Sequence, residues 1–319
     1  MVAVRPNTPV RGTQLLIEHM GEIFRRPSLI AIEVAWRWLF GIPFLLVCWT
    51  QARQILISFP LESSGFNSID TQNPWVAAVQ LANGFSYYEP HVVAVLRWLL
   101  PGAAVAWVVL SGLGRNFLLR RMEARLPFRP IVMIALQAAW LALLALALLG
   151  WFASMQWVAT THIAVAGAPT DRSSSVGWVA GEPDLVGYFI WAIFLSLGFF
   201  TAFALISWLL SIAPLLALLE RRSALSALGQ SLRLGRPFTG KLAEINLVLG
   251  IVKLALIVLA MVFSAAPLPF SDELGGSALH MVWAASALIY VVANDFFQVV
   301  RIKAFLEFWR IFRNGAQEA

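Results

Sequence analysis

Six long apolar runs dominate the sequence. A helix needs about 20 mainly apolar residues to cross roughly 30 Å of hydrocarbon. The runs are continuous and rich in Leu and Ala rather than alternating, which argues against the strands of a membrane β-barrel. We therefore predict an all-α, polytopic membrane bundle with about six transmembrane helices. The predicted spans are residues 29–50, 91–111, 131–155, 187–213, 243–266 and 279–300.

The low content of charge supports this class. Charged residues make up 13% of the 319 residues and hydrophobic residues 60%, whereas a soluble chain carries about 25% charged residues. No charged or Ser/Gly-rich linker divides the chain. We predict one transmembrane domain, residues 29–300, between a cytoplasmic N-terminal tail (1–28) and a cytoplasmic C-terminal tail (301–319). The single cysteine, Cys48, excludes an intramolecular disulfide.

The basic residues indicate an orientation. The two tails and the connections after spans 2 and 4 hold 18 of the 23 Lys and Arg residues. The connections 51–90, 156–186 and 267–278 hold only Arg53 and Arg172. Because Lys and Arg are enriched in cytoplasmic loops, we predict that both termini are cytoplasmic and that the protein lies in the bacterial inner membrane.

This division assigns Arg115 to the connection after span 2 and Arg301 to the C-terminal tail. Basic segments beside a membrane contact anionic lipid headgroups. The high isoelectric point is thus explained by membrane lipids as partners, and we predict no nucleic-acid binding.

Both tails carry apolar residues at helical spacing. We interpret them as amphipathic helices on the inner membrane surface, or alternatively as docking sites for a protein partner. The apolar residues are Leu16, Met20, Ile23 and Phe24 in the first tail, and Ile302, Phe305, Leu306, Trp309 and Phe312 in the second.

The stretch LGRPFTGKL, residues 234–242, has the glycine and lysine spacing of a phosphate-binding P-loop, at Gly235, Gly240 and Lys241. A working P-loop follows a strand and has Ser or Thr after the lysine to hold magnesium. Here a short amphipathic helix is predicted before it, and Leu242 takes the place of the hydroxyl. We predict a turn between two helices and no nucleotide site.

The segment LLERRSALSALGQSLRLGRPFTGKLAEINLVLGIV, from Leu218 to Val252, joins a basic amphipathic helix to an apolar span. It resembles bacterial six-helix membrane domains, such as the one that accompanies some glycerophosphodiester phosphodiesterases, and their uncharacterised relatives. No catalytic phosphodiesterase domain follows in this sequence. The resemblance therefore implies an architecture and carries over no active-site residue.

Ionisable side chains within predicted spans suggest functional sites. Glu33 and Arg37 are four residues apart, a spacing that allows an ion pair on one helix face. Lys253 and Asp295 lie in adjacent spans, where they are predicted to form a second pair or to serve a polar substrate or proton path. The full set is Glu33, Arg37, Arg97, Glu244, Lys253 and Asp295. Its formal charge is zero, which favours structural pairing.

Two histidines offer a different chemistry. His91 and His280 are predicted near the outer ends of spans 2 and 6, where they would be able to ligate haem, a chlorophyll-type pigment or a metal. The sequence has no HExxH motif, no GxSxG motif and no acidic cluster with metal spacing. We assign no catalytic residue and no metal site, predict no cofactor apart from this alternative, and weigh the evidence against an enzyme.

Three functions follow from these patterns. The first is a non-catalytic accessory, scaffold or assembly protein with partner proteins in the membrane, suggested by the basic inner face and the amphipathic tails. The second is a transporter of a small solute or lipid that uses Lys253 and Asp295. The third is a subunit that carries a cofactor on His91 and His280.

Overall fold

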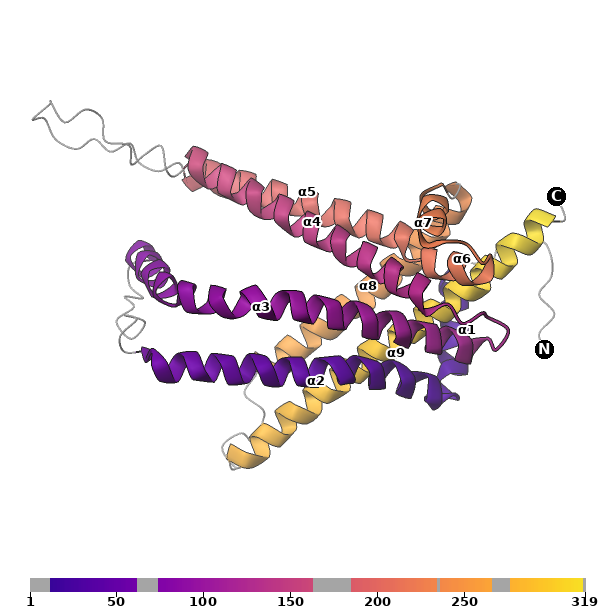
Figure 1. Cartoon of the computed structure of the whole chain (residues 1–319), viewed down its shortest axis with the longest axis horizontal. Coiled ribbons are helices and arrows are strands. Elements are labelled where there is room, and N and C mark those ends of the chain that lie inside the picture. Colours follow the sequence, from indigo (N-terminus) through magenta and orange to yellow (C-terminus); the bar gives the residue numbers. More distant parts are fainter. Residues whose placement is uncertain (1–11, 62–73, 163–184, 234–235, 266–275, 318–319) are drawn as a thin grey trace, which may run out of the picture.

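The computed structural model of the chain describes residues 12–61, 74–162, 185–233, 236–265 and 276–317, and nearly all of them are helical (Figure 1). Their helices, in chain order, are α1 (Gly12–Phe24), α2 (Pro27–Ser58), α3 (Pro74–Met122), α4 (Pro130–His162), α5 (Leu185–Leu210), α6 (Ala213–Leu219), α7 (Ala224–Leu232), α8 (Arg236–Ala265) and α9 (Gly276–Gln317).

Six helical segments in this part of the chain are long and apolar enough to cross a membrane, which confirms the prediction of an all-helical, multi-pass architecture. The segments are Pro27–Ser58, Asn83–Met122, Pro130–His162, Val186–Leu219, Leu242–Leu259 and Ala284–Ile311.

Two of these helices extend well beyond the predicted spans. α3 continues through Pro90 and Pro101 to Met122, and membrane helices tolerate such prolines when neighbours satisfy the freed carbonyls. α9 passes residue 300 without a break and ends at Gln317. The predicted C-terminal tail is therefore helical up to Gln317, as its apolar spacing indicated, and it continues the helix of span 6.

The fourth span is interrupted. α5 ends at Leu210 and α6 begins at Ala213, with Pro214 in its first turn. Proline has no N–H to continue the helical ladder, and the amide of Leu215 instead bonds the carbonyl of Ile212 over 3.0 Å. The interrupted backbone is enclosed by protein, since Ile212 and Ala213 are buried.

The apolar core gathers at one end of the bundle. There α1, α6 and α7 pack among the ends of α3, α4, α8 and α9. The apolar faces predicted for the two tails belong to this core: Leu16 and Ile23 of α1 are buried, and so are Phe305 and Trp309 of α9. Phe24 is the exception, with 78% of its surface exposed.

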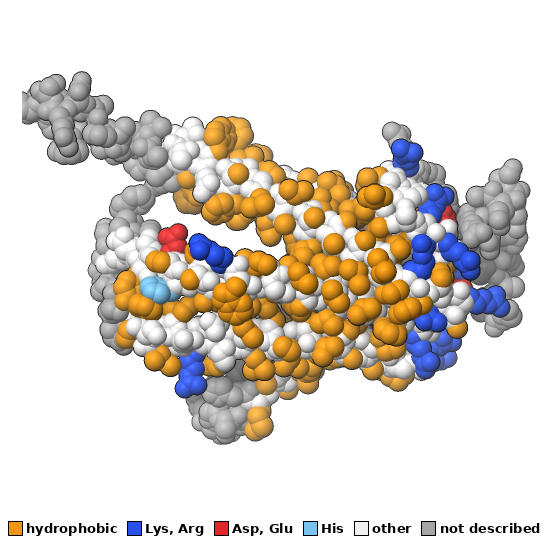
Figure 2. All heavy atoms as spheres, in the orientation of Figure 1, with side chains coloured by type: hydrophobic (Ala, Val, Ile, Leu, Met, Phe, Trp, Pro, Cys, Tyr) orange, Lys and Arg blue, Asp and Glu red, His pale blue; other side chains and the backbone are white. Residues whose placement is uncertain are grey.

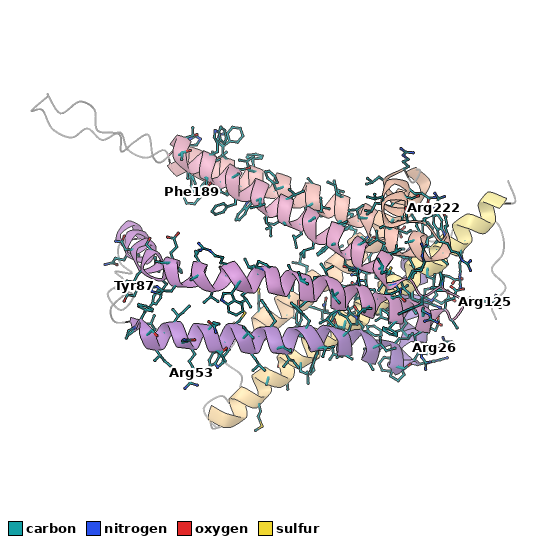
Figure 3. All side chains as sticks on the ribbon, in the orientation of Figure 1. Arg26, Arg53, Tyr87, Arg125, Phe189 and Arg222 are labelled. Carbon is teal, nitrogen blue, oxygen red and sulfur yellow. The ribbon has the colours of Figure 1, made fainter. Side chains whose placement is uncertain are left out.

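On the face seen in Figure 2, basic side chains gather at this same end. Arg26, Arg125 and Arg222 lie there, whereas Arg53 lies towards the opposite end of α2 (Figure 3). We call the first the basic end and the second the far end. α1 packs against the C-terminal half of α9 at the basic end, where Lys303 lies 3.4 Å from Glu22.

Towards the far end the helices separate. α4 and α5 stay together and diverge from α2 and α3, which leaves the cleft visible in Figure 2. Large apolar side chains are exposed along these lengths, among them Trp49, Phe152 and Phe194. A surface of this kind is suited to contact with lipid tails.

Two glycines bring α3 close to its neighbours. A Cβ atom on Gly112 would lie 2.8 Å from the Cα of Ile134 in α4. A Cβ atom on Gly114 would overlap the ring of Trp36 in α2. Small residues allow such close approach of membrane helices, and here they hold α2, α3 and α4 together near the basic end.

Candidate polar site inside the bundle

An ion-pair network joins the first and last long helices. Glu33 is completely buried, and its Oε1 lies 2.7 Å from Nη2 of Arg37. The indole of Trp36 donates a hydrogen bond of 2.8 Å to the other oxygen of Glu33. Arg37 also donates from Nη1 to Oδ1 of Asp295 in α9 over 2.6 Å. Arg37 thus bridges two buried carboxylates.

The spacing within α2 explains half of this network. Residues three and four apart share a helix face, so Trp36 and Arg37 both reach Glu33 without leaving the helix. The other half depends on the fold, because Asp295 is 258 residues from Arg37 in the chain. Asp295 is 1% exposed and is presented by the buried face of α9 that also carries Val299.

Lys253 falls within the predicted fifth span, residues 243–266. It lies in α8 within electrostatic range of Asp295, but the ion pair of Asp295 is made with Arg37. Arg97, by contrast, is exposed on α3.

Two arginines missing from the sequence-based set join the cluster. Arg115 of α3 and Arg301 of α9 fall inside segments able to cross a membrane. Arg115 is helical and not in a loop as predicted, whereas Arg301 lies where α9 continues into the predicted C-terminal tail. Both are partly buried, and the Nε atom of each is buried without a hydrogen-bond partner among the described residues. Each interacts electrostatically with both Glu33 and Arg37.

The sequence contains a helical pattern that places these two arginines on buried faces of α3 and α9. In α3, Ser111, Arg115 and Leu118 follow one another at spacings of four and three, and Ser111 and Leu118 are buried. In α9, Gln298, Arg301 and Phe305 repeat the pattern at spacings of three and four, with Gln298 and Phe305 buried. The helical period therefore continued past the ends of the apolar runs.

The cluster is positively charged as a whole. It joins four bases with two acids, an excess of two formal positive charges, rather than the neutral set expected from the sequence. Its members are Glu33, Arg37, Arg115, Lys253, Asp295 and Arg301. An unpaired charge away from water is costly, so this excess favours a bound anion.

A cavity of about 160 Å³ lies beside the two arginines. Arg115 and Arg301 line it together with the polar side chains of Gln137, Ser207 and Ser211. Trp140 also lines it and donates from its indole to Ser207 over 3.0 Å. Ser211 stands at the break between α5 and α6, so the interrupted span forms part of the cavity wall.

The histidine pair predicted as a ligand set is only half described. The ring of His91 lies against Phe59, with 3.6 Å between ring centroids. His280 belongs to α9, but its side chain lies outside what the structure describes. No group of three or more His, Cys, Asp or Glu side chains in the described ranges is arranged to hold a metal ion. The cofactor alternative stays a prediction.

The P-loop-like stretch is helical where it is described. α8 begins at Arg236 and contains Gly240 and Lys241, whereas Gly235 lies outside the described residues. The short helix predicted before it is α7, whose N-cap Ser223 accepts a hydrogen bond from the amide of Ser226 over 3.4 Å.

No protein-family model, no curated protein and no solved structure matches this chain. The resemblance of residues 218–252 to bacterial six-helix domains therefore stays a prediction. The six long apolar helices in the described part of the chain indicate its class, a membrane-embedded helical protein.

Proposed function

We propose that this protein is a multi-pass permease of the bacterial cytoplasmic membrane that carries a small anionic solute, with the basic end and both termini in the cytoplasm. The observation that supports the proposal most strongly is the excess of positive charge at Arg115 and Arg301, beside a polar cavity. Charges inside a membrane span are costly and commonly mark substrate or ion paths.

The size and chemistry of the cavity favour a small oxyanion. About 160 Å³ holds on the order of ten water-sized groups, since one needs roughly 10–15 Å³ by this measure. Guanidinium groups match the geometry of phosphate and carboxylate oxygens, and Gln137, Ser207 and Ser211 add neutral hydrogen-bonding groups. We therefore infer a substrate with a phosphate, sulfate or carboxylate group.

Movement of such a solute is favoured by the interrupted helix. Discontinuous spans line the substrate sites of many transporters, because unwound backbone can contact the solute and act as a hinge. Here the break at Ser211 and Ile212 adjoins the cavity that Arg115 and Arg301 line. Lys253 and Asp295 lie in the same charged cluster and would adjust its charge during a transport cycle.

Thermal unfolding of the purified protein in mild detergent tests the binding step. Inorganic phosphate, sulfate and succinate would each be titrated against chloride at constant ionic strength. A ligand at 100 times its Kd stabilises the folded state by about 2.7 kcal/mol. We expect stabilisation by at least one of these anions, its loss in Arg115→Gln and Arg301→Gln, and its retention in Arg53→Gln.

Transport itself would be measured as exchange of the labelled anion that stabilises the protein, using proteoliposomes. The same two variants should lose exchange while still reconstituting as folded protein. Equal stability in all three anions and in chloride would contradict the proposal, and so would stabilisation that survives both arginine substitutions.

A second candidate function is an accessory or scaffold protein that binds a partner at the basic end. Ile17 and Phe24 of α1 and Leu225 of α7 are exposed there by 72%, 78% and 83%, so these apolar side chains are accessible to a partner. The apolar face of the C-terminal tail, which includes Phe305 and Trp309, is buried within the protein and is therefore not accessible to a partner. Purification in mild detergent would recover a stoichiometric partner, which Phe24→Ser with Leu225→Ser would release; a protein that purifies alone contradicts it.

A further inference from the structure

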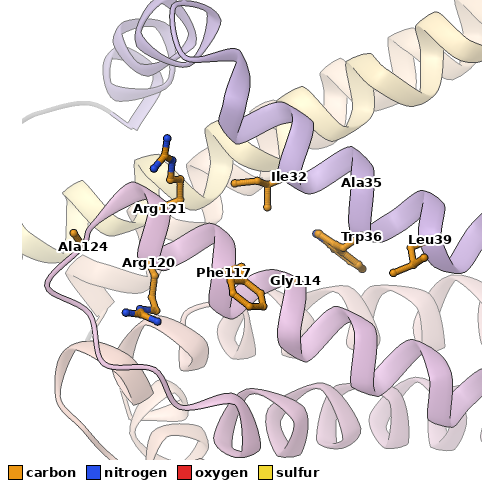
Figure 4. A pocket seen from close by; sticks show the side chains of 9 residues that line it. All are labelled: Ile32, Ala35, Trp36, Leu39, Gly114, Phe117, Arg120, Arg121 and Ala124. Atoms are coloured by element: carbon orange, nitrogen blue, oxygen red, sulfur yellow. The ribbon is translucent and has the colours of Figure 1, made fainter.

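A separate groove of about 740 Å³ lies between α2 and α3 at the basic end (Figure 4). Its wall from α2 includes Ile32, Trp36 and Leu39, and its wall from α3 includes Phe117. Gly114 contributes no side chain, so the ring of Trp36 lies directly against the α3 backbone. The groove is therefore apolar along most of its length.

The charge of the groove is confined to one end. Arg120 and Arg121, in the last turn of α3, are both exposed and line it there. No acidic residue lines the groove, and neither arginine has an ion-pair partner among the described residues. Arg120 also lies over the ring of Phe128, 5.3 Å from its centroid, which steadies its position.

The layout matches the dimensions of a lipid. α2 leaves the basic end where α3 returns to it, so Arg121 and Ile32 mark one end of the groove and Gly114 and Leu39 the other (Figure 4). Seven residues of helix at 1.5 Å each separate the two ends by about 10 Å. A headgroup phosphate at the arginines would thus leave the first part of an acyl chain against Trp36 and Leu39.

We infer that this groove binds one anionic phospholipid from the leaflet at the basic end. Arg120 and Arg121 bind its phosphate-bearing headgroup, and the apolar walls bind one of its chains. The site is distinct from the internal cavity, since Arg115 and Arg301 do not line the groove. The lipid site can therefore be tested independently of the proposed transport.

Lipid titration followed by native mass spectrometry tests the inference on the full chain in detergent. The probes are phosphatidylglycerol and phosphatidylcholine with identical palmitoyl and oleoyl chains. Two arginines near a headgroup predict that phosphatidylglycerol binds at least about tenfold more tightly. Arg120→Gln with Arg121→Gln should remove this preference.

Two matched controls separate a built site from general attraction. Arg125→Gln with Arg233→Gln removes the same charge from exposed positions outside the groove, and should keep the preference. Ala35→Trp fills the groove from an exposed position and should abolish tight binding, whereas Leu46→Trp changes an exposed residue of the same helix outside it and should not.

Four results would overturn the inference: equal affinity for the two lipids, a preference unchanged in the Arg120/Arg121 variant, an equal loss in the Arg125/Arg233 variant, or tight binding that survives Ala35→Trp. Binding of glycerol 1-phosphate as strong as that of the lipid would reveal a simple phosphate site and would also overturn it. A dimer that disappears in the groove variants would identify a second copy of the chain as the occupant instead.

Discussion

Arg37 of α2 and Asp295 of α9 form an ion pair with 2.6 Å between Nη1 and Oδ1, and so connect the first and last long helices of the bundle. Removing one partner of a buried pair leaves a charge without compensation, which costs about 3–5 kcal/mol. We expect Arg37→Leu, which leaves the buried carboxylates of Glu33 and Asp295 without this cation, to lower stability by this order, measured by thermal unfolding in mild detergent. Arg37→Leu with Asp295→Leu should cost less than the two single changes together.

The exposed Arg53, near the other end of α2, provides a control for that experiment. Arg53→Leu should leave the unfolding temperature nearly unchanged, because surface charges contribute little. Strictly additive losses for Arg37 and Asp295 would show that the pair does not couple the two helices.

Close packing at Gly112 gives a second prediction. An added methyl group would meet the backbone of Ile134, which cannot rotate away as a side chain can. We expect Gly112→Ala to force α3 and α4 apart and to cost about 1–3 kcal/mol of stability. Gly102→Ala is the matched control: nothing lies within 4 Å of its Cβ position, so better helix propensity should be neutral or stabilising.

Glu22 links stability to pH at the basic end. Burial alone would raise its pKa, but Lys303 of α9 and His19 outweigh burial, and the pKa is lowered from 4.5. Lys303 and Arg26 lie 3.4 and 3.7 Å from its Oε1, and His19 Nδ1 lies 3.3 Å from its Oε2.

A carboxylate with a lowered folded-state pKa stabilises the fold above its unfolded pKa and loses this contribution as the pH falls through the folded value. The unfolding temperature should therefore drop below about pH 4.5 in the wild type. Glu22→Gln should lack this component, which amounts to about 1 kcal/mol or less for a partly exposed group. Identical pH profiles for the two proteins would contradict the assignment.

The orientation is tested by cysteine labelling in a Cys48→Ser background. Arg125→Cys and Arg222→Cys lie at the basic end, and Arg53→Cys lies towards the far end (Figure 3). On intact spheroplasts a membrane-impermeant maleimide should label only the Arg53→Cys protein, and all three should react after lysis. Labelling of residues 125 and 222 from opposite sides would contradict the topology.

The sequence was sufficient for the architecture because a membrane span has to be long and apolar wherever it lies in the bundle. It also brought Glu33 and Arg37 together, since a spacing of four places both on one helix face. Neither hydropathy nor the spacing within one helix predicts a contact between residues of different helices. The contact of Arg37 with Asp295 depends on which helices become neighbours, and local periodicity does not predict how helices pack together.

Arg115 and Arg301 are absent from the predicted set of intramembrane charges for a different reason. A hydropathy window ends a span where charges begin, whereas hydrogen bonding lets a helix continue for as long as a face remains to be buried. α3 and α9 continue in this way, because Leu118 and Phe305 belong to the core. The positive excess that supports the proposed function therefore lies in residues that simple span prediction assigns to a loop and a tail.

The most direct test of an anion site is a structure determined in the presence of tungstate, with its anomalous scattering used to locate the ion. The account predicts a strong peak in the cavity of about 160 Å³, within hydrogen-bond distance of both Arg115 and Arg301, and its absence in Arg301→Gln. A cavity without a peak, while tungstate occupies exposed arginines at the basic end, would contradict the account.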